Sequence, residues 1–350
     1  MPYEHGEISE HTCTIGRHEM FYQAAGPAHG PLVIFAHGWP ELGHSWRHQL
    51  PLLGGLGFRA IAPDLRGHGR SSVYHRHDAY TMENHVADLI GLLDAIGGAR
   101  AVWVGHDWGA PVIWSIASHH PERCHAVANL CVPYRALDLG LAGVVALVDR
   151  NVYPEDEYPA GQWDYQYFYQ ENFSRAVAVF EANPGNTIKA LLRKSGPDDR
   201  GTPALTASIR RHGGWFGGAD AAPDVPRDDD VISESDLATY VSALERTGFF
   251  GTCSFYMNHD ANTAYAATAV NGGYLDMPVL FLAAAYDYVC ECVDSRLPEP
   301  MRRYCRNLTE RTVNSGHWMA QEKPVDVNNA LVHWLANAVS AVWPHPPLGG

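Results

Sequence analysis

The chain has 350 residues, of which 46% are hydrophobic and 18% are charged, and its formal net charge is −14. This composition predicts a folded globular protein and excludes a largely disordered one. The acidic balance argues against nucleic acid and against an anionic membrane surface as partners, because both attract basic faces.

The ends and the cysteines give no sign of export. The N-terminal stretch MPYEHGEISEHTC is polar and acidic, so we expect no signal peptide. The longest apolar run, roughly residues 139–148, is too short to span a bilayer. The seven cysteines show no spacing typical of a disulfide framework, which favours reduced thiols and a cytoplasmic location.

The twenty histidines raise the question of a metal site. His44 and His48 are spaced like helical metal ligands, but no carboxylate completes a metal motif with them. Cys290 and Cys292 are separated by one residue, which does not match the common zinc spacings. We therefore expect no metal and no other cofactor.

In chain order, the first elements are two strand-like runs around Gly16 and Arg17, which predict a β-hairpin. Short continuous apolar runs follow, a pattern typical of fully buried strands. We expect these strands at residues 32–38, 59–64, 101–105, 125–133, 278–285 and 311–316.

Helical periodicity lies between the strands. Residues 81–97 collect apolar side chains on one face and have Thr81 in position to cap the start. Residues 324–339 show the same pattern, and Pro324 suits a first helical turn. Strands that alternate with helices predict an α/β fold with a doubly wound, mostly parallel sheet.

This alternation stops between about Tyr134 and Gly272. The segment is rich in aromatic residues and predicts several helices, interrupted by a long loop rich in Gly, Pro and Asp at residues 195–230. The simplest arrangement is a helical lid, residues 134–272, inserted into a core formed by residues 1–133 and 273–350.

The stretch GHDWG, residues 105–109, follows an expected buried strand and precedes an apolar helix. Gly105 and Gly109 permit a sharp strand-to-helix turn, which would present Asp107 as a nucleophile. The alternative is an aspartate that caps an ordinary helix. We favour the nucleophile because suitable partners also occur in the chain.

Those partners are an acid and a histidine later in the sequence. Asp287 and His317 each follow a predicted core strand, and ligands gather at the carboxyl ends of such strands. A helix cap and a packed loop histidine are the respective alternatives. Asp294 is the substitute acid, although it lies further from its strand.

The motif HGWP, residues 37–40, follows an early strand. In this arrangement the backbone amides of Trp39 and Trp108 would form an oxyanion hole. We place His37 and Pro40 beside the substrate. The Gly-rich stretch PDLRGHGRSS lacks the lysine and the spacing of a phosphate-binding loop.

The motifs HGWP, PDLRGHGRSS, GHDWG, AAYDYV and SGHWMAQEKP occur in the order typical of the α/β-hydrolase superfamily, over about residues 32–339. The chain resembles the soluble-type epoxide hydrolases in particular. The resemblance implies an α/β-hydrolase fold and the conversion of an epoxide and water to a vicinal diol without a cofactor. It also implies two lid tyrosines that donate to the epoxide oxygen, aligned here to Tyr165 and Tyr256.

The position of Tyr165 has two rivals, because Tyr167 and Tyr169 lie close to it in the same motif. Each of the assigned tyrosines could instead belong to the lid core.

An aspartate nucleophile suits carbon–heteroatom bonds that are not acyl bonds. Its carboxylate would form an ester with the substrate carbon. Water activated by His317, with Asp287 orienting the imidazole, would then hydrolyse that ester. A small apolar aryl or alkyl epoxide is the expected substrate, because aromatic lid residues predict an apolar pocket: Trp163, Tyr167, Phe168, Trp215 and Phe216.

Two other functions compete with this one. Haloalkane dehalogenases share the aspartate on a sharp strand-to-helix turn and often the tryptophan after it, so Trp108 does not distinguish the two functions. The paired lid tyrosines favour epoxide hydrolysis. A ligand-binding protein without catalysis is the third hypothesis, since the fold alone does not imply an activity. The sequence leaves the oligomeric state open, with a homo-oligomer among the options.

Overall fold

A computed structural model of the protein describes residues 6–344. Residues 1–5 and 345–350 lie outside the described part, so the expectation about a signal peptide falls partly outside it, as does the Pro- and Gly-rich C-terminal end. Among the described residues, no helix is both long and apolar enough to cross a membrane.

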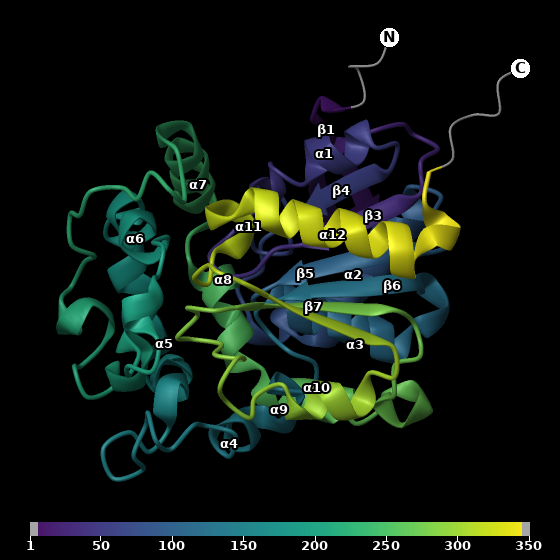
Figure 1. The fold of residues 1–350 in the computed structure, drawn as a ribbon. Helices are drawn as coiled ribbons and strands as arrows, with labels where there is room; N and C mark the ends of the chain where they lie inside the picture. Colours follow the sequence, from purple (N-terminus) through teal and green to yellow (C-terminus); the bar gives the residue numbers. More distant parts are fainter. Residues whose placement is uncertain (1–5, 345–350) are drawn as a thin grey trace, which may run out of the picture.

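A single eight-stranded sheet forms the centre of the molecule, in the order β1-β2-β4-β3-β5-β6-β7-β8 (Figure 1). The first two strands form an antiparallel hairpin and the strands from β3 to β8 are parallel, which confirms the predicted fold class. The bounds are β1 Ser9–Ile15, β2 His18–Ala25, β3 Leu32–Ala36, β4 Arg59–Pro63, β5 Ala101–His106, β6 Cys124–Leu130, β7 Val279–Ala284 and β8 Leu308–Val313.

The last strand lies earlier in the sequence than predicted. It begins at Leu308 rather than Arg311 and ends at Val313. The strand is at the edge of the sheet, and most of its side chains are exposed or half-buried. It therefore lacks the continuous apolar run that marks the central strands.

Helices cover both faces of the sheet, as the alternating pattern predicts. In Figure 1, α12 crosses in front of the sheet and α3 lies behind it. Thr81 caps α2, and its Oγ1 accepts a hydrogen bond from the Asn84 amide at 3.4 Å. The core helices are α1 Leu50–Gly55, α2 Met82–Ala95, α3 Gly109–His119, α10 Glu299–Tyr304, α11 Met319–Glu322 and α12 Pro324–Ala338.

The chain between β6 and β7 is helical, and α5, α6 and α7 stand beside one end of the sheet (Figure 1). This insertion contains the lid that we propose for residues 134–272. Residues 195–230 form a loop with three short 3₁₀ turns. The helices are α4 Gly140–Val145, α5 Asp164–Glu181, α6 Pro184–Leu191, α7 Glu234–Thr247, α8 Phe250–Cys253 and α9 His259–Ala266, with the 3₁₀ turn η10 at Ser254–Met257.

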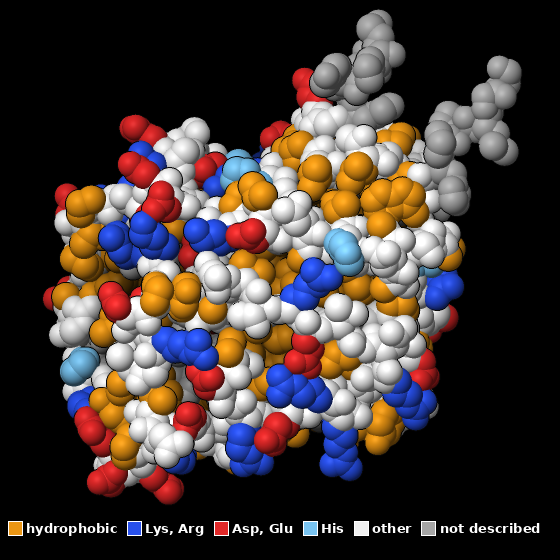
Figure 2. All heavy atoms as spheres, in the orientation of Figure 1, with side chains coloured by type: hydrophobic (Ala, Val, Ile, Leu, Met, Phe, Trp, Pro, Cys, Tyr) orange, Lys and Arg blue, Asp and Glu red, His pale blue; other side chains and the backbone are white. Residues whose placement is uncertain are grey.

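The surface carries both signs of charge. Figure 2 shows acidic and basic side chains interspersed over the face seen in Figure 1, with no continuous basic patch on that face. Below the surface, the central strands are almost completely buried, and β5 and β7 have no exposed residue. The sheet is therefore a rigid base for groups that follow its strands.

Candidate active site

Asp107 occupies a sharp turn between β5 and α3. Its φ of +49° lies in the left-handed region, which a non-glycine residue adopts at a cost in conformational energy. The two glycines of the motif make room for this turn. A Cβ on Gly105 would lie 2.3 Å from Asn129 Oδ1, and a Cβ on Gly109 would lie 2.2 Å from the Ala36 carbonyl oxygen.

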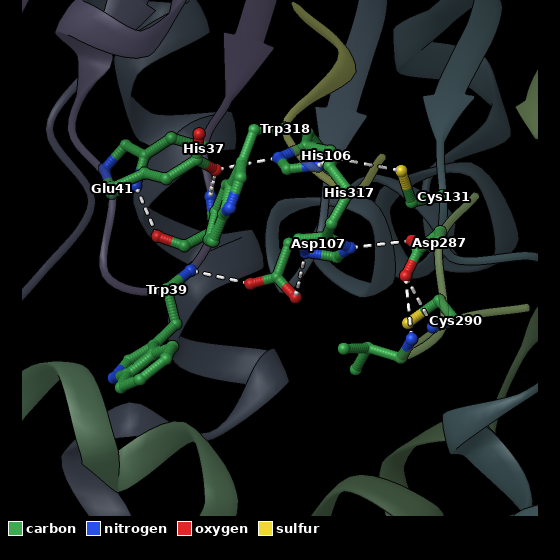
Figure 3. Close-up of polar contacts among 12 residues, drawn as sticks. His37, Trp39, Glu41, His106, Asp107, Cys131, Asp287, Cys290, His317 and Trp318 are labelled. Carbon is green, nitrogen blue, oxygen red and sulfur yellow. Dashed lines mark hydrogen bonds and ion pairs between the residues drawn. The ribbon is translucent and has the colours of Figure 1, made fainter. Parts of the chain in front are cut away.

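The two oxygens of the Asp107 carboxylate have different neighbours. The Trp39 amide donates a hydrogen bond to Oδ1 at 2.7 Å, and His317 Nε2 lies 3.5 Å from Oδ2 (Figure 3). Among the described residues the Trp108 amide makes no hydrogen bond to this carboxylate. The structure thus brings one of the two predicted oxyanion-hole donors to Asp107.

His317 lies between two carboxylates, with Asp107 on one side and Asp287 on the other (Figure 3). Its Nδ1 is 2.7 Å from Asp287 Oδ2, while Asp287 Oδ1 accepts the amides of Val289 and Cys290, each at 2.9 Å. Burial opposes a charge on the imidazole, but Asp287 and Asp107 outweigh it and raise the pKa of His317 well above its usual range.

Asp294, the substitute acid, is about half exposed and forms an ion pair with Arg200 at 2.8 Å. Among the described residues, its carboxylate makes no hydrogen bond or ion pair with His317. The geometry therefore favours Asp287 over Asp294 as the partner of His317.

Tyr165, in α5, and Tyr256, in η10, line the same cavity of about 340 Å³ as Asp107 and His317. Their ring centroids are 5.5 Å apart, and both side chains are buried. Burial raises the pKa of both phenols well above the usual range, and the negative charge of Asp107 adds to the effect. Both phenols therefore keep their protons and can donate.

The two rival tyrosines lie elsewhere. Tyr167 packs its ring under the Arg210 guanidinium at 4.9 Å, and Tyr169 stacks on Tyr256 with centroids 4.2 Å apart. Neither lines the cavity. Residues two apart on a helix point to different sides, so Tyr165 and Tyr167 cannot both face the cavity.

Two of the predicted substrate-binding residues, Trp215 and Phe216, line the cavity. The other five are not among the residues that line it. The His37 ring is fully buried, donating to the Gly38 carbonyl at 2.9 Å and accepting the Leu65 amide at 2.9 Å. The remaining four are also absent from the cavity wall. Pro40, Trp163 and Phe168 are buried in the core, and the Tyr167 ring faces Arg210.

Most of the cavity wall comes from residues that no sequence pattern indicated. Leu191, Arg193, Ile209 and Val225 line it and come from the end of α6 and from the loop at residues 195–230. Such a loop has no periodicity from which the inward-facing residues could be inferred.

Two carboxylates that no sequence pattern indicated bind the backbone of the loops around the site. Glu41 Oε2 accepts the Gly38 amide at 3.0 Å and contacts His106 Nδ1 at 2.8 Å. Glu322 accepts the Gly316 amide at 2.7 Å and the Trp318 amide at 3.0 Å, on either side of His317. Their only signal in the sequence is that each follows a catalytic motif closely, within HGWPE and GHWMAQE.

Two sets of side chains near His317 have atoms close enough together to bind a metal ion. One contains His106 and Cys131, the other Asp287 and Cys290, and both include His317. Since His317 Nδ1 already contacts Asp287, and Cys131 Sγ donates to the His317 carbonyl at 3.3 Å, these groups are engaged with one another. Both sets therefore form part of the hydrogen-bonded surroundings of His317.

Comparisons with known proteins show the family of this chain. A family model described as alpha/beta hydrolase fold matches residues 31–324. Epoxide hydrolase A of Mycobacterium tuberculosis is 34% identical over 314 residues, which are 89% of this chain and 92% of that protein. Bifunctional epoxide hydrolase 2 of Sus scrofa is 32% identical over 308 residues, 87% of this chain but only 51% of that protein. The crystal structure of epoxide hydrolase A from Mycobacterium thermoresistibile aligns with a TM-score of 0.75 and 32% identity, over 95% of this chain and 99% of that one.

Proposed function

Because this chain belongs to the α/β-hydrolase fold family, we propose that it is an epoxide hydrolase, which converts an epoxide and water to a vicinal diol. The observation that carries the proposal is the cavity that Asp107 shares with the two protonated phenols of Tyr165 and Tyr256. A carboxylate nucleophile and two acids are the groups that epoxide opening needs.

In the first step, Asp107 Oδ2 attacks a ring carbon of the epoxide. The Trp39 amide holds Oδ1, which leaves Oδ2 for the substrate. A new C–O ester bond forms, the ring C–O bond breaks, and its electron pair goes to the epoxide oxygen. Tyr165 and Tyr256 donate hydrogen bonds to this oxygen, and one of them transfers a proton to it.

In the second step, His317 removes a proton from water, and the hydroxide attacks the carbonyl carbon of the ester. The Trp39 amide stabilises the negative oxygen of the tetrahedral intermediate. The C–O bond between the Asp107 carbonyl carbon and the substrate oxygen then breaks. The leaving oxygen takes the proton of the new carboxyl group, which restores the aspartate and releases the diol, and the proton on His317 returns to the tyrosinate. Because the ester carries no negative charge, the contribution of Asp107 to the raised pKa of His317 disappears, and the neutral base is favoured.

The tyrosines also distinguish this proposal from dehalogenation with the same nucleophile and base. A halide leaves as a weak base and needs only hydrogen bonds. The oxygen of an opened epoxide is a strong base and needs an acid. Two buried phenols that retain their protons match the second requirement.

The test is the intact mass of the His317→Gln protein after mixing with styrene oxide and, separately, with a haloalkane. Without its base, the protein should form the ester and hydrolyse it slowly, so its mass should rise by that of the whole epoxide. The additional change Asp107→Ala should abolish the adduct, and Tyr165→Phe with Tyr256→Phe should prevent its formation. An adduct from the haloalkane alone would make the protein a dehalogenase, and no adduct from either compound would contradict both.

The remaining expectations belong to the same proposal. We assign a small apolar epoxide and water as the substrates, with no nucleic-acid or membrane partner. The cytoplasmic location is supported by the seven cysteines, all of which are free thiols in the described residues.

A further inference from the structure

Gln166 follows Tyr165 in α5 and contacts the hydroxyl group of that tyrosine. Its Nε2 donates a hydrogen bond to the Tyr165 hydroxyl oxygen at 3.1 Å. Gln166 is 1% exposed and is not among the residues that line the cavity, whereas Tyr165 is. The amide can therefore act on a bound substrate only through the phenol.

The Gln166 side chain carries an energetic cost where it lies. Its Oε1 is buried and has no hydrogen-bond partner among the described residues. A buried amide oxygen without a partner destabilises the folded protein, and a leucine of similar size would avoid this cost. A buried polar group of this kind calls for a reason, and the hydrogen bond to Tyr165 supplies one.

The same hydrogen bond decides where the Tyr165 proton can point. A phenol oxygen has one proton to donate and lone pairs that accept. Because the Gln166 amide occupies the accepting side, the proton must point elsewhere. Among the described residues no acceptor receives a hydrogen bond from Tyr165, and the residue lines the cavity. Its proton is therefore available to an oxygen that binds there.

Tyr256 has a different environment. Its ring stacks on Tyr169 with centroids 4.2 Å apart and meets the Trp108 ring edge to face at 5.1 Å. Within the described part of the chain, no amide group donates to its hydroxyl oxygen. The two phenols thus line one cavity with unequal support for their oxygen atoms.

This difference matters when a proton is transferred, because the phenol that loses it becomes negative. Burial raises the pKa of both phenols, but the Gln166 amide and the positive charge of His317 act to lower that of Tyr165. A hydrogen bond to an ionised group is stronger than one to a neutral group. The Gln166 amide therefore stabilises Tyr165 more in the transition state of proton transfer than before it.

We propose that Gln166 is a positioning residue that makes Tyr165, rather than Tyr256, the phenol that transfers its proton to the epoxide oxygen. The Tyr165 O–H bond breaks as the ring C–O bond opens, and the proton forms the new hydroxyl group of the substrate. The electron pair stays on the Tyr165 oxygen until the proton from His317 restores the phenol. Tyr256 keeps its proton and contributes a hydrogen bond. This inference rests on the proposed function, because it concerns the opening of an epoxide.

The test measures single turnovers of styrene oxide by rapid quench. The dependence of the rate on substrate concentration gives the binding of styrene oxide, and the time course gives the rates of ester formation and ester hydrolysis. In Gln166→Leu we expect ester formation to slow about tenfold, because a hydrogen bond to a charged oxygen is lost. Binding and ester hydrolysis should change little, whereas a merely structural role would weaken all three.

Double-mutant cycles show on which tyrosine the amide acts. In the Tyr256→Phe protein, Gln166→Leu should again slow ester formation about tenfold. In the Tyr165→Phe protein it should have no further effect, because the phenol that accepts the amide is absent. The same loss in both proteins, or equal losses in ester formation and ester hydrolysis, would overturn the inference.

Two further variants complete the set. Gln166→Met keeps an unbranched side chain without the donor, adapts readily to a core, and should reproduce the loss seen in Gln166→Leu. Gln170→Leu makes the same change at an exposed position one turn later in α5, and should leave every step unchanged. Ester formation at the full rate in Gln166→Met, or a loss in Gln170→Leu equal to that in Gln166→Leu, would also overturn the inference.

The unchanged enzyme separates this inference from the proposed function. If neither it nor the His317→Gln protein formed an ester with styrene oxide, the proposed function and the role of Gln166 would both fail. If the ester formed and Gln166→Leu formed it at the full rate, the role of Gln166 alone would fail.

Discussion

At the scale of single residues, the catalytic groups are held by hydrogen bonds to backbone amides that flank them. Asp287 accepts two amides of its own loop, and Glu322 accepts the amides on both sides of His317. The sequence could predict Asp287, because it follows a buried strand within a motif that the family shares. It could not predict the role of Glu322, because a carboxylate that binds main-chain amides has no characteristic side-chain partner in the sequence.

The position of Glu322 leads to a prediction about one step of the reaction. Glu322→Gln replaces an acceptor oxygen with an NH₂ group facing an amide donor, and so displaces the loop that holds His317. We expect hydrolysis of the Asp107 ester to slow by about tenfold or more, because a base must lie within hydrogen-bond reach of its water. Formation of the ester should slow much less, since its reacting groups are Asp107 and the two tyrosines and not His317. Rapid-quench single-turnover kinetics measures both steps.

The control is Glu299→Gln, which alters an exposed carboxylate paired with Arg296 on the surface. It should change neither step. If Glu322→Gln slowed ester formation and ester hydrolysis equally, Glu322 would be a general structural residue. Burial also raises the pKa of Glu322 to about 7, so lowering the pH through that value should slow ester hydrolysis in the unchanged enzyme.

At the scale of elements, the strands and helices of the core follow from hydrophobic patterns, and the lid does not. The continuous apolar runs at β3, β5 and β7 predict their positions within one or two residues. The wall of the cavity comes largely from α6 and a loop of irregular structure, where tertiary packing alone decides which side chains face inward. Five of the predicted substrate contacts do not line the cavity, and they come from the loop after β3 and from the start of the insertion.

The sharp turn at Asp107 predicts that Gly109→Ala and Gly55→Ala differ strongly in their effects on stability and activity. Gly109→Ala would place a methyl group 2.2 Å from the Ala36 carbonyl oxygen, so the helix must move away from the sheet. We expect a loss of about 1–3 kcal/mol in the free energy of unfolding, typical of overpacking in a core, together with loss of activity. Urea unfolding measures the first effect and styrene oxide turnover the second.

Gly55, at the end of α1, is the matched control. It is exposed, and a Cβ added there meets no atom within 4 Å. Gly55→Ala should leave both the stability and the activity nearly unchanged. If the Gly109→Ala protein were as stable and as active as the Gly55→Ala protein, the turn at Asp107 would tolerate a larger residue than the structure allows.

At the scale of the whole molecule, buried neutral histidines couple stability to pH. His37 and His68 lie beneath the active-site loops with ring centroids 4.8 Å apart, and both are almost fully buried. Burial lowers the pKa of His37 to about 4 and that of His68 to about 3. In the unfolded chain both return to about 6.5.

Stability should therefore fall as the pH is lowered. Below pH 6.5 the unfolded chain binds protons at these histidines and the folded protein does not, until the pH approaches about 4. Each histidine should then reduce the free energy of unfolding by about 1.4 kcal/mol per pH unit over this range. Urea unfolding at several pH values measures the slope.

His68→Asn removes one of these groups and keeps a donor for the Arg66 carbonyl, which His68 Nδ1 contacts at 3.0 Å. Its stability should decline less steeply between pH 6.5 and 4 than that of the unchanged protein. The exposed His29→Asn is the control and should retain the full slope. An unchanged slope in His68→Asn would mean that this histidine does not titrate differently in the folded and unfolded states.

The reacting groups come from two parts of the chain, and this division limits which molecules can react covalently with Asp107. Asp107 and His317 follow core strands, whereas Tyr165 and Tyr256 come from the helical insertion. Any displacement of the insertion from the sheet separates the acids from the nucleophile and leaves a carboxylate that opens epoxides poorly. An epoxide that does not fit between the two parts therefore meets an aspartate without its acids, so covalent capture is limited to epoxides that the cavity accommodates.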